Sequence, residues 1–125
     1  MQTLTRDIAA ARIDWLVSLT ADKADWPPWT SDQFMADLPG KWDLSFIGPH
    51  GVAIISTRPG QPHLHLLAVE INHRGMGHGS AMMAEAIRRG VRSLKVPGDA
   101  PQTVKFYRRH GFQFKPRWLA MEMAS

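Results

Sequence analysis

The sequence predicts an α/β fold, with one domain in which helices flank a mixed central sheet. Its 125 residues suit a single domain, and a hydrophobic content of 44% is enough to form a core. Segments with strand-like alternation are mixed with segments of helical periodicity, in the order ααβββαβαββ. Strands and helices mixed over this length favour one sheet covered on both faces.

The N-terminal half is predicted to hold two helices and three strands. Apolar side chains recur at helical spacing from residue 4, and Thr30 or Ser31 is a capping signal for a second helix that stops at Pro39-Gly40. A Gly-Pro-His-Gly turn, 48–51, separates two β-rich runs and predicts a hairpin. The expected elements are helices over 4–20 and 30–38 and strands over 42–48, 51–57 and 63–71.

The C-terminal half is predicted to alternate helices with short strands. Met83, Ile87 and Val91 form one apolar stripe, which indicates a helix. Pro101 is suited to open a second helix and Gly111 to close it. The expected elements are helices over 77–90 and 100–111 and strands over 92–96, 112–115 and 117–123.

Composition excludes several classes of site. The absence of cysteine rules out disulfides, thiolate zinc sites and cysteine nucleophiles. No apolar run approaches the length of a membrane span, and the N-terminus lacks the apolar stretch of a signal peptide. We therefore expect a cytoplasmic protein without a membrane partner.

Charge is distributed unevenly along the chain. Residues 1–73 carry a formal charge of −3 and residues 74–125 carry +7, which agrees with the total of +4. Such a field attracts phosphates, nucleic acid or an anionic cofactor, although a solvated basic face is the simpler interpretation. No exposed aromatic stripe is interleaved with the arginines, which makes a nucleic-acid partner the less favoured alternative.

The segment "RGMGHGS", 74–80, lies between a predicted strand and a predicted helix. Glycines at this position allow a ligand to approach the backbone, and the first amides of the helix then favour negative charge. A phosphate or diphosphate is the expected ligand group, and a tight turn without a ligand is the alternative. The glycine spacing fits neither a P-loop nor the dinucleotide fingerprint.

Two motifs give the chain a resemblance to the GNAT N-acetyltransferase superfamily. "RGMGHG", 74–79, resembles that family's acyl-CoA signature, [Q/R]-x-x-G-x-[G/A], and "LLAV", 66–69, resembles its splayed strand end. "APQTVKFYRRHGF", 100–112, resembles a second family pattern but has Ala100 for its asparagine and Thr103 for its alanine; Asp99 could take over the capping role. The resemblance covers about 42–123 and implies a single GNAT-like domain that lacks the family's usual first strand.

Within that superfamily, "HLHLLAV" is similar to the arylalkylamine N-acetyltransferases, which carry a His-x-His pair before Leu-Ala-Val. The similarity implies a general base at His63 and His65. An alkylammonium has a pKa near ~10, so freeing the amine at neutral pH requires roughly 4 kcal/mol and a base. Histidine, with an ordinary pKa of ~6.5, suits this task, and residues i and i+2 of a strand share one face.

Other interpretations of these histidines remain open. The pair could face solvent without a function, and Glu70 is an alternative base. A metal site would need His73 or Glu70 as a third ligand, and neither clearly lies on the same face as the pair. We therefore expect acetyl-CoA as co-substrate and no metal.

The resemblance also implies the remaining site residues. Tyr107, the only tyrosine, stands where the family's general acid lies, and a main-chain amide near Val69 would donate to the thioester carbonyl. Arg108 is a further candidate for the outer phosphates. The residues implied in acetyl-CoA binding are Leu67, Ala68, Val69, Arg74, Gly75, Met76, Gly77, His78, Gly79, Ser80 and Arg109.

The acceptor amine is poorly marked in the sequence. Trp15, Trp26, Trp29 and Trp42 lie in the acidic N-terminal part and suit a cationic or aromatic amine, although core packing is the simpler role for Trp15 and Trp42. We expect 1–41 to form a helical acceptor-side segment, with "ADWPPW" as a lid, and 42–125 to form the sheet core with the acetyl-CoA site. An uncovered sheet edge would favour a homodimer. A non-catalytic acyl-CoA-binding or nucleic-acid-binding module is the alternative function.

Overall fold

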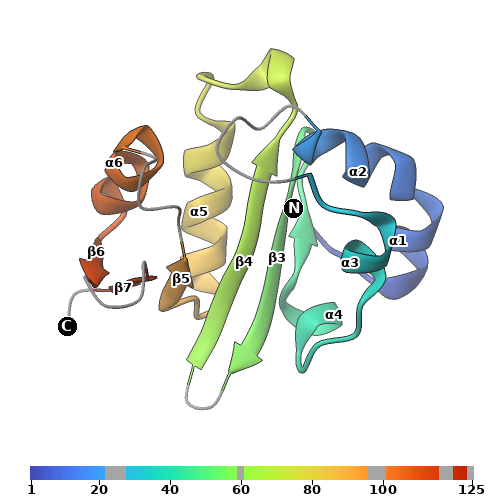
Figure 1. Ribbon diagram of the computed structural model, residues 1–125, viewed down its shortest axis with the longest axis horizontal. Coiled ribbons are helices and arrows are strands. Elements are labelled where there is room, and N and C mark those ends of the chain that lie inside the picture. Colours follow the sequence, from blue (N-terminus) through green and yellow to red (C-terminus); the bar gives the residue numbers. More distant parts are fainter. Residues whose placement is uncertain (22–27, 59–60, 96–100, 116–119, 124–125) are drawn as a thin grey trace.

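The computed structural model describes residues 1–21, 28–58, 61–95, 101–115 and 120–123. Within these ranges the chain forms an α/β domain, as predicted (Figure 1). Trp26, most of the expected lid, and the pair Asp99-Ala100 lie outside the described residues.

A seven-stranded mixed sheet runs through the middle of the domain. Its strand order is β1-β2-β3-β4-β5-β7-β6, and every neighbouring pair is antiparallel except β4 and β5, which are parallel. The strands are β1 Gln2–Thr3, β2 Phe46–Ile47, β3 Gly51–Arg58, β4 Gln61–Val69, β5 Ser93–Lys95, β6 Phe112–Lys115 and β7 Ala120–Met123.

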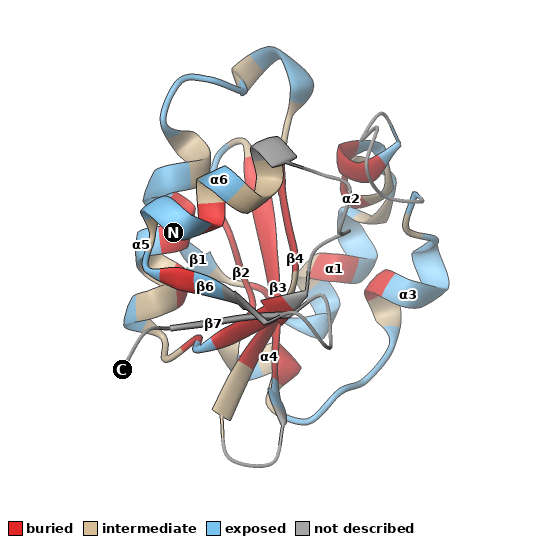
Figure 2. Cartoon of the chain, turned by 60° about the vertical axis from the view of Figure 1, so that its left-hand side comes forward, coloured by how far each residue is buried: buried red, intermediate tan, exposed pale blue. Residues whose placement is uncertain are grey.

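Helices cover both faces of this sheet (Figure 1). The helices are α1 Arg6–Ala11, α2 Ile13–Thr20, α3 Ser31–Met35, α4 Lys41–Leu44, α5 His78–Arg88 and α6 Pro101–Arg109, with a 3-10 turn at Ile71–His73. One core packs residues of α5 and α6 on one sheet face, and a second core packs residues of α1, α2 and α3 on the other. The central strands β3 and β4 are buried between these layers (Figure 2).

The expectation that the first strand is missing was wrong. Gln2 and Thr3 form β1, which pairs with Ile47 and Phe46 of β2. A two-residue strand is too short to produce an alternating pattern, so it could not be predicted from periodicity. Because β1 covers the edge of β2, the homodimer loses the support of an exposed edge at this position and stays a prediction.

Two other boundaries differ from those predicted. The helix expected over 4–20 is divided at Arg12, whose φ of −116° and ψ of 24° leave the helical region between α1 and α2. The strand expected from residue 42 begins only at Phe46, because 41–44 form the short helix α4. The capping box of Thr30 and Gln33 and the hairpin bond from Gly48 N to Gly51 O agree with the predicted signals.

A β-bulge interrupts the pairing of β3 with β4. Ile55 pairs with Leu64 and Ile54 with Leu66, so His65 is an extra residue on β4. Beyond it, Leu67 packs in the α5 core, whereas Leu66 and Ala68 pack in the α2 core. Because of the bulge, Leu67 and Val69 in the last part of β4 face α5.

Two cations stabilise the fold rather than face solvent. Lys41 is 1% exposed, and its Nζ donates to the carbonyls of Phe34 and Ala36 at 2.6 and 2.5 Å. Burial lowers the pKa of the Lys41 ammonium to about 8. Arg89 pairs with Glu85 at 2.8 Å and donates to Thr3 Oγ1, so it ties α5 to β1.

None of the helices among the described residues combines the length and the apolar character needed to cross a bilayer.

Candidate active site

The site begins where β4 separates from β5. Among the residues that the structure describes, only His63 and Leu64 of β4 pair with β5, at Ser93 and Leu94, although β4 continues to Val69. The last residues of β4 therefore extend beyond this parallel pairing. Helix α6 supplies the facing wall at this level.

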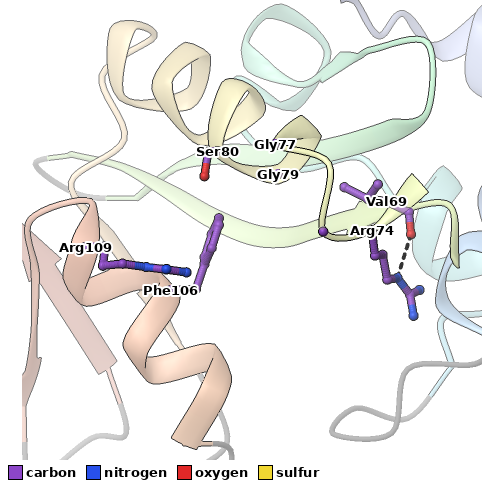
Figure 3. A pocket seen from close by; sticks show the side chains of 8 residues that line it. Val69, Arg74, Gly77, Gly79, Ser80, Phe106 and Arg109 are labelled. Carbon is purple, nitrogen blue, oxygen red and sulfur yellow. Dashed lines mark hydrogen bonds between the residues drawn. The ribbon is translucent and has the colours of Figure 1, made fainter. Parts of the chain in front are cut away.

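Two adjoining hollows occupy this opening. The first, of about 500 Å³, lies against the glycine turn and is lined by Val69, Arg74, Gly75, Gly77, Gly79, Ser80, Phe106 and Arg109. The second, of about 420 Å³, lies along the end of β4 and is lined by Leu67, Ala68, Val69, Arg74, Gly79, Thr103, Phe106 and Tyr107. They share four lining residues, so they form one continuous groove. Figure 3 shows the residues of the first hollow.

Two glycines give the turn its shape. Gly75 and Gly77 have φ angles of +79° and +90°, in the region that side chains rarely adopt, and a Cβ at either would meet no atom within 4 Å. Gly79 instead lies within α5, where a Cβ would be 3.6 Å from the Phe106 ring. The positive φ angles by themselves account for glycine at these two positions, and a ligand-binding role for the turn stays a prediction.

The N-terminus of α5 opens on the first hollow. Gly77 is its N-cap residue and provides no side-chain cap, and the first bond of the helix runs from Ala81 N to Gly77 O. Within the described ranges, no hydrogen bond engages the amides of His78, Gly79 and Ser80. These donors and the positive end of the helix dipole suit a diphosphate.

The arginines of the basic half have different roles. The Arg109 side chain lines the first hollow, and Arg74 lines both hollows and donates from Nε to the Val69 carbonyl at 3.0 Å (Figure 3). In contrast, Arg88 and Arg89 pair with Glu85, and Arg92 donates to the Val91 carbonyl. Two of these arginines are thus paired with Glu85, which offsets part of the +7 charge and weakens the argument for a nucleic-acid surface.

Tyr107 lies in the wall of the second hollow. Its side chain is 9% exposed, and burial raises the pKa of its hydroxyl well above the usual value, so the group carries a proton at neutral pH. Among the described residues no hydrogen bond engages this hydroxyl. A protonated hydroxyl in the wall of the hollow is suited to donate a proton to a ligand there.

The predicted histidine pair comes together on the opposite face of the sheet from α5. The rings of His63 and His65 are 4.9 Å apart. Nδ1 of His63 lies 2.7 Å from Ser93 Oγ, and Nε2 of His65 lies 2.5 Å from Ser56 Oγ. His63 is 4% exposed and His65 is half-buried, and neither lines the two hollows.

Three other predicted residues lie apart from the groove. Met76 is 67% exposed on the turn, and the imidazole of His78 contacts those of His50 and His73. Glu70, the alternative base, is engaged by His50 Nδ1 at 2.9 Å.

Thr103 and Phe106 also line the groove but were not predicted from the sequence. Phe106 and Tyr107 follow Thr103 by three and four residues, which places both one turn beyond it, and that helical spacing was the available signal. The serine partners of the two histidines were also not identified, because they come from other strands.

The described tryptophans contribute to packing. Trp29 packs against Phe34, Trp15 stacks under the Arg12 guanidinium at 3.9 Å, and Trp42 donates from Nε1 to Asp37 at 2.8 Å. That bond and the Arg6 contact hold the pKa of the Asp37 carboxyl below its usual value. The packing role expected for Trp15 and Trp42 agrees with these contacts.

The chain belongs to the acetyltransferase (GNAT) domain family, whose sequence pattern matches residues 44–114. The match includes both strands of the central hairpin, the glycine turn and α6. No curated protein sequence matches the chain significantly.

Several solved structures share this fold, and an N-acetyltransferase is among them. Ard1 from Thermoplasma volcanium is 20% identical with a TM-score of 0.68, over 84% of this chain and 78% of that one. The ribosomal-protein-S18-alanine N-acetyltransferase from Escherichia coli is 18% identical with a TM-score of 0.68, over 91% and 77%. Naa50 from Arabidopsis thaliana, solved with the bisubstrate analogue CoA-Ac-MVNAL, is 18% identical with a TM-score of 0.64, over 84% and 79%. At these identities the likeness establishes the fold alone.

Proposed function

We propose that this chain transfers an acetyl group from acetyl-CoA to a primary amine of a small molecule or a peptide, by direct attack of the amine on the thioester. The observation that carries the proposal is the continuous groove from the glycine turn to Tyr107, along the end of β4. One end supplies donors for a diphosphate, and the other supplies a buried hydroxyl beside the end of the strand.

The groove suits the two parts of coenzyme A differently. The α5 amides of His78, Gly79 and Ser80 would bind the diphosphate, with Arg109 and Arg74 close by. The second hollow is walled by Leu67, Ala68 and Val69, which would contact the narrow pantetheine arm. A main-chain amide of this strand end would stabilise negative charge on the thioester oxygen. Residues 42–125 would thus supply the acetyl-CoA site.

Tyr107 would act as the general acid. Its hydroxyl is held in the neutral, protonated form by burial. The same burial would raise the pKa of a departing thiol in the hollow, which would offset the weaker acidity that burial gives the tyrosine when the proton passes to the sulfur.

His63 and His65 would remove the proton of the acceptor ammonium. Their rings are 4.9 Å apart and each is oriented by a serine hydroxyl, which fits a short relay. Half-buried His65 is the member suited to receive the proton, directly or through a water, and buried His63 would be its inner partner. The acceptor would approach from the α1–α3 side, and the N-terminal segment would shape its site.

The experiment is an assay of thiol release from acetyl-CoA with two panels, small alkyl or arylalkyl amines and short peptides with free N-termini. Mass spectrometry of the products locates the acetyl group. The proposal predicts turnover with at least one acceptor, and affinity for CoA in calorimetry. Affinity without turnover for either panel would favour the non-catalytic acyl-CoA-binding module, and absence of both would contradict the proposed function.

A further inference from the structure

Four side chains gather beside the glycine turn, and the proposed reaction uses none of them. His50 lies in the turn between β2 and β3, Glu70 follows β4, His73 ends the 3-10 turn and His78 begins α5. A backbone bond of 2.8 Å from Glu70 N to His50 O joins the hairpin to the end of β4. Segments distant in the sequence are thus fixed next to one another.

The donor atoms of this cluster converge. One ligand atom each from His50, Glu70 and His73 lies within 4.8 Å of the others. His50 Nδ1 is 2.9 Å from Glu70 Oε1. The His78 ring lies 4.8 Å from that of His50 and 5.8 Å from that of His73, so a fourth imidazole is within reach.

One of these atoms lacks a partner. Nδ1 of His73 is buried and makes no hydrogen bond within the described residues. A buried polar atom that is left unpaired destabilises a fold by roughly 1–3 kcal/mol. An ion placed among the three side chains could accept this nitrogen as a ligand.

We propose that His50, Glu70 and His73 bind a first-row divalent cation, with Zn²⁺ as the expected ion and His78 or a water molecule in the fourth position. Two imidazoles and one carboxylate are a donor set typical of zinc, whereas Mg²⁺ and Ca²⁺ prefer oxygen ligands. Zinc bond lengths of about 2.0–2.2 Å at a tetrahedral angle place neighbouring ligand atoms about 3.3 Å apart, close to the His50–Glu70 distance.

The site requires a small rearrangement. The His50 and His73 rings are stacked, with centroids 3.6 Å apart and 11° between their planes, so their in-plane lone pairs lie in two nearly parallel planes. One ring must tilt for both nitrogens to meet one ion. The His50 side chain is 31% exposed and has room to turn.

This location differs from the metal interpretation considered for the sequence, in which His63 and His65 would be ligands. Those two imidazoles are bonded to Ser93 and Ser56, and neither Glu70 nor His73 is associated with them. His50 was not predicted as a ligand because it lies 20 residues before Glu70 in the sequence. The β3–β4 hairpin brings the two side chains together.

The test uses the full chain without a polyhistidine tag, stripped with a chelator. Titration calorimetry with Zn²⁺, and the visible spectrum of the Co²⁺-substituted protein, report stoichiometry and nitrogen coordination. We expect one ion per chain. Glu70→Gln and His73→Ala should each weaken binding about 100-fold or more, because even outer-shell changes weaken metal sites by 10- to 100-fold.

Matched controls are His65→Gln and His110→Gln, which remove imidazoles outside the cluster and should leave binding unchanged. Circular dichroism establishes that each variant is folded; if His73→Ala does not fold, the partly exposed His50→Gln replaces it. Absence of stoichiometric binding by the parent chain would overturn the proposal. So would unchanged affinity in Glu70→Gln, or loss of binding in His65→Gln alone. None of these readouts depends on acetyl transfer.

Discussion

Ser56 Oγ lies 2.5 Å from His65 Nε2, although the sheet pairs Ser56 with His63. His65 is the diagonal neighbour of Ser56, two residues beyond the paired His63, and such neighbours on one face of a hairpin lie within reach of a long side chain. One hydroxyl thus orients the more exposed imidazole of the pair.

The first prediction concerns this contact. His65→Ala should slow acetyl transfer by ~10²–10⁴ while CoA affinity survives, because the side chain does not line the groove. Ser56→Ala should slow acetyl transfer about 5- to 10-fold, which corresponds to the free energy of one hydrogen bond. Steady-state kinetics should locate both losses in kcat, with an unchanged KM for acetyl-CoA. A rise in that KM would instead indicate distortion of β4.

The second prediction concerns Tyr107. Tyr107→Phe keeps the ring in the core and removes a hydroxyl that makes no hydrogen bond within the described part of the chain. Thermal stability should therefore be unchanged, whereas kcat should fall ~10²–10⁴-fold if the hydroxyl protonates the thiolate. Calorimetry with CoA provides the binding control. An unchanged kcat would remove the tyrosine from the mechanism.

The third prediction separates two glycines of the turn. Gly77→Ala places a side chain at a φ of +90°, which should destabilise the protein by about 1–2 kcal/mol and weaken CoA binding. Gly79→Ala is the matched control for stability, because its added Cβ meets only ordinary contact with Phe106 at 3.6 Å. Thermal unfolding of both variants should show a loss only for Gly77→Ala, and equal losses would contradict this account of the turn.

The fourth prediction concerns the arginines. Arg109→Gln should weaken CoA binding about tenfold and reduce its sensitivity to salt, because a charge lining the phosphate hollow is removed. Arg88→Gln, which removes an exposed partner of Glu85 outside the groove, should change neither property. Calorimetry at two salt concentrations measures the CoA affinity of both variants. Similar losses of affinity would mean that CoA binding depends on the overall charge and not on the position of Arg109.

The fifth prediction concerns Lys41 and pH. Its pKa is about 8 in the folded protein and 10.5 ordinarily, so below pH 8 both the folded and the unfolded states carry the proton and the penalty for the buried charge is complete. Between pH 8 and 10.5 the unfolded state binds more protons, so stability should rise with pH, by roughly 3 kcal/mol over the whole window.

Urea unfolding at pH 7.5 and pH 10 tests this sign. Lys41→Met should lack the rise seen in the parent chain. At pH 7.5 it should also lose stability by about 1–3 kcal/mol, because the Phe34 and Ala36 carbonyls lose their donor. Exposed Lys105→Met is the control and should preserve the rise. A parallel pH dependence in all three proteins would contradict the assignment.

The sequence predicted most of the sheet, and the errors have local causes. β3, β5 and α6 were found because alternation, Pro101 and Gly111 mark them directly. Residues 42–44 were assigned to a strand because apolar and polar residues alternate there. In the structure, Gly40 in the left-handed region starts a helix that places the Lys41 ammonium beneath the carbonyls of α3.

The groove was predicted more completely than its surroundings. Its glycines and the end of β4 form one continuous motif, so sequence order alone brings them together. Ser56, Ser93 and His50 come from other strands or turns, and their proximity to the histidines and Glu70 follows from register and from the bulge. These contacts join residues that are 9, 30 and 20 positions apart, and no regular spacing in the sequence predicts them.

The single surplus residue at position 65 also shifts the phase of β4. Upstream of it, even-numbered Leu64 faces α5; downstream, odd-numbered Leu67 does so. If β4 kept His65 without the bulge, plain two-residue alternation would turn Leu67 and Val69 toward α2 and Leu66 toward the groove. The bulge therefore lets odd-numbered residues of β4 serve both faces. His63 and His65 lie on one face of the sheet, and Leu67 and Val69 line the groove on the other.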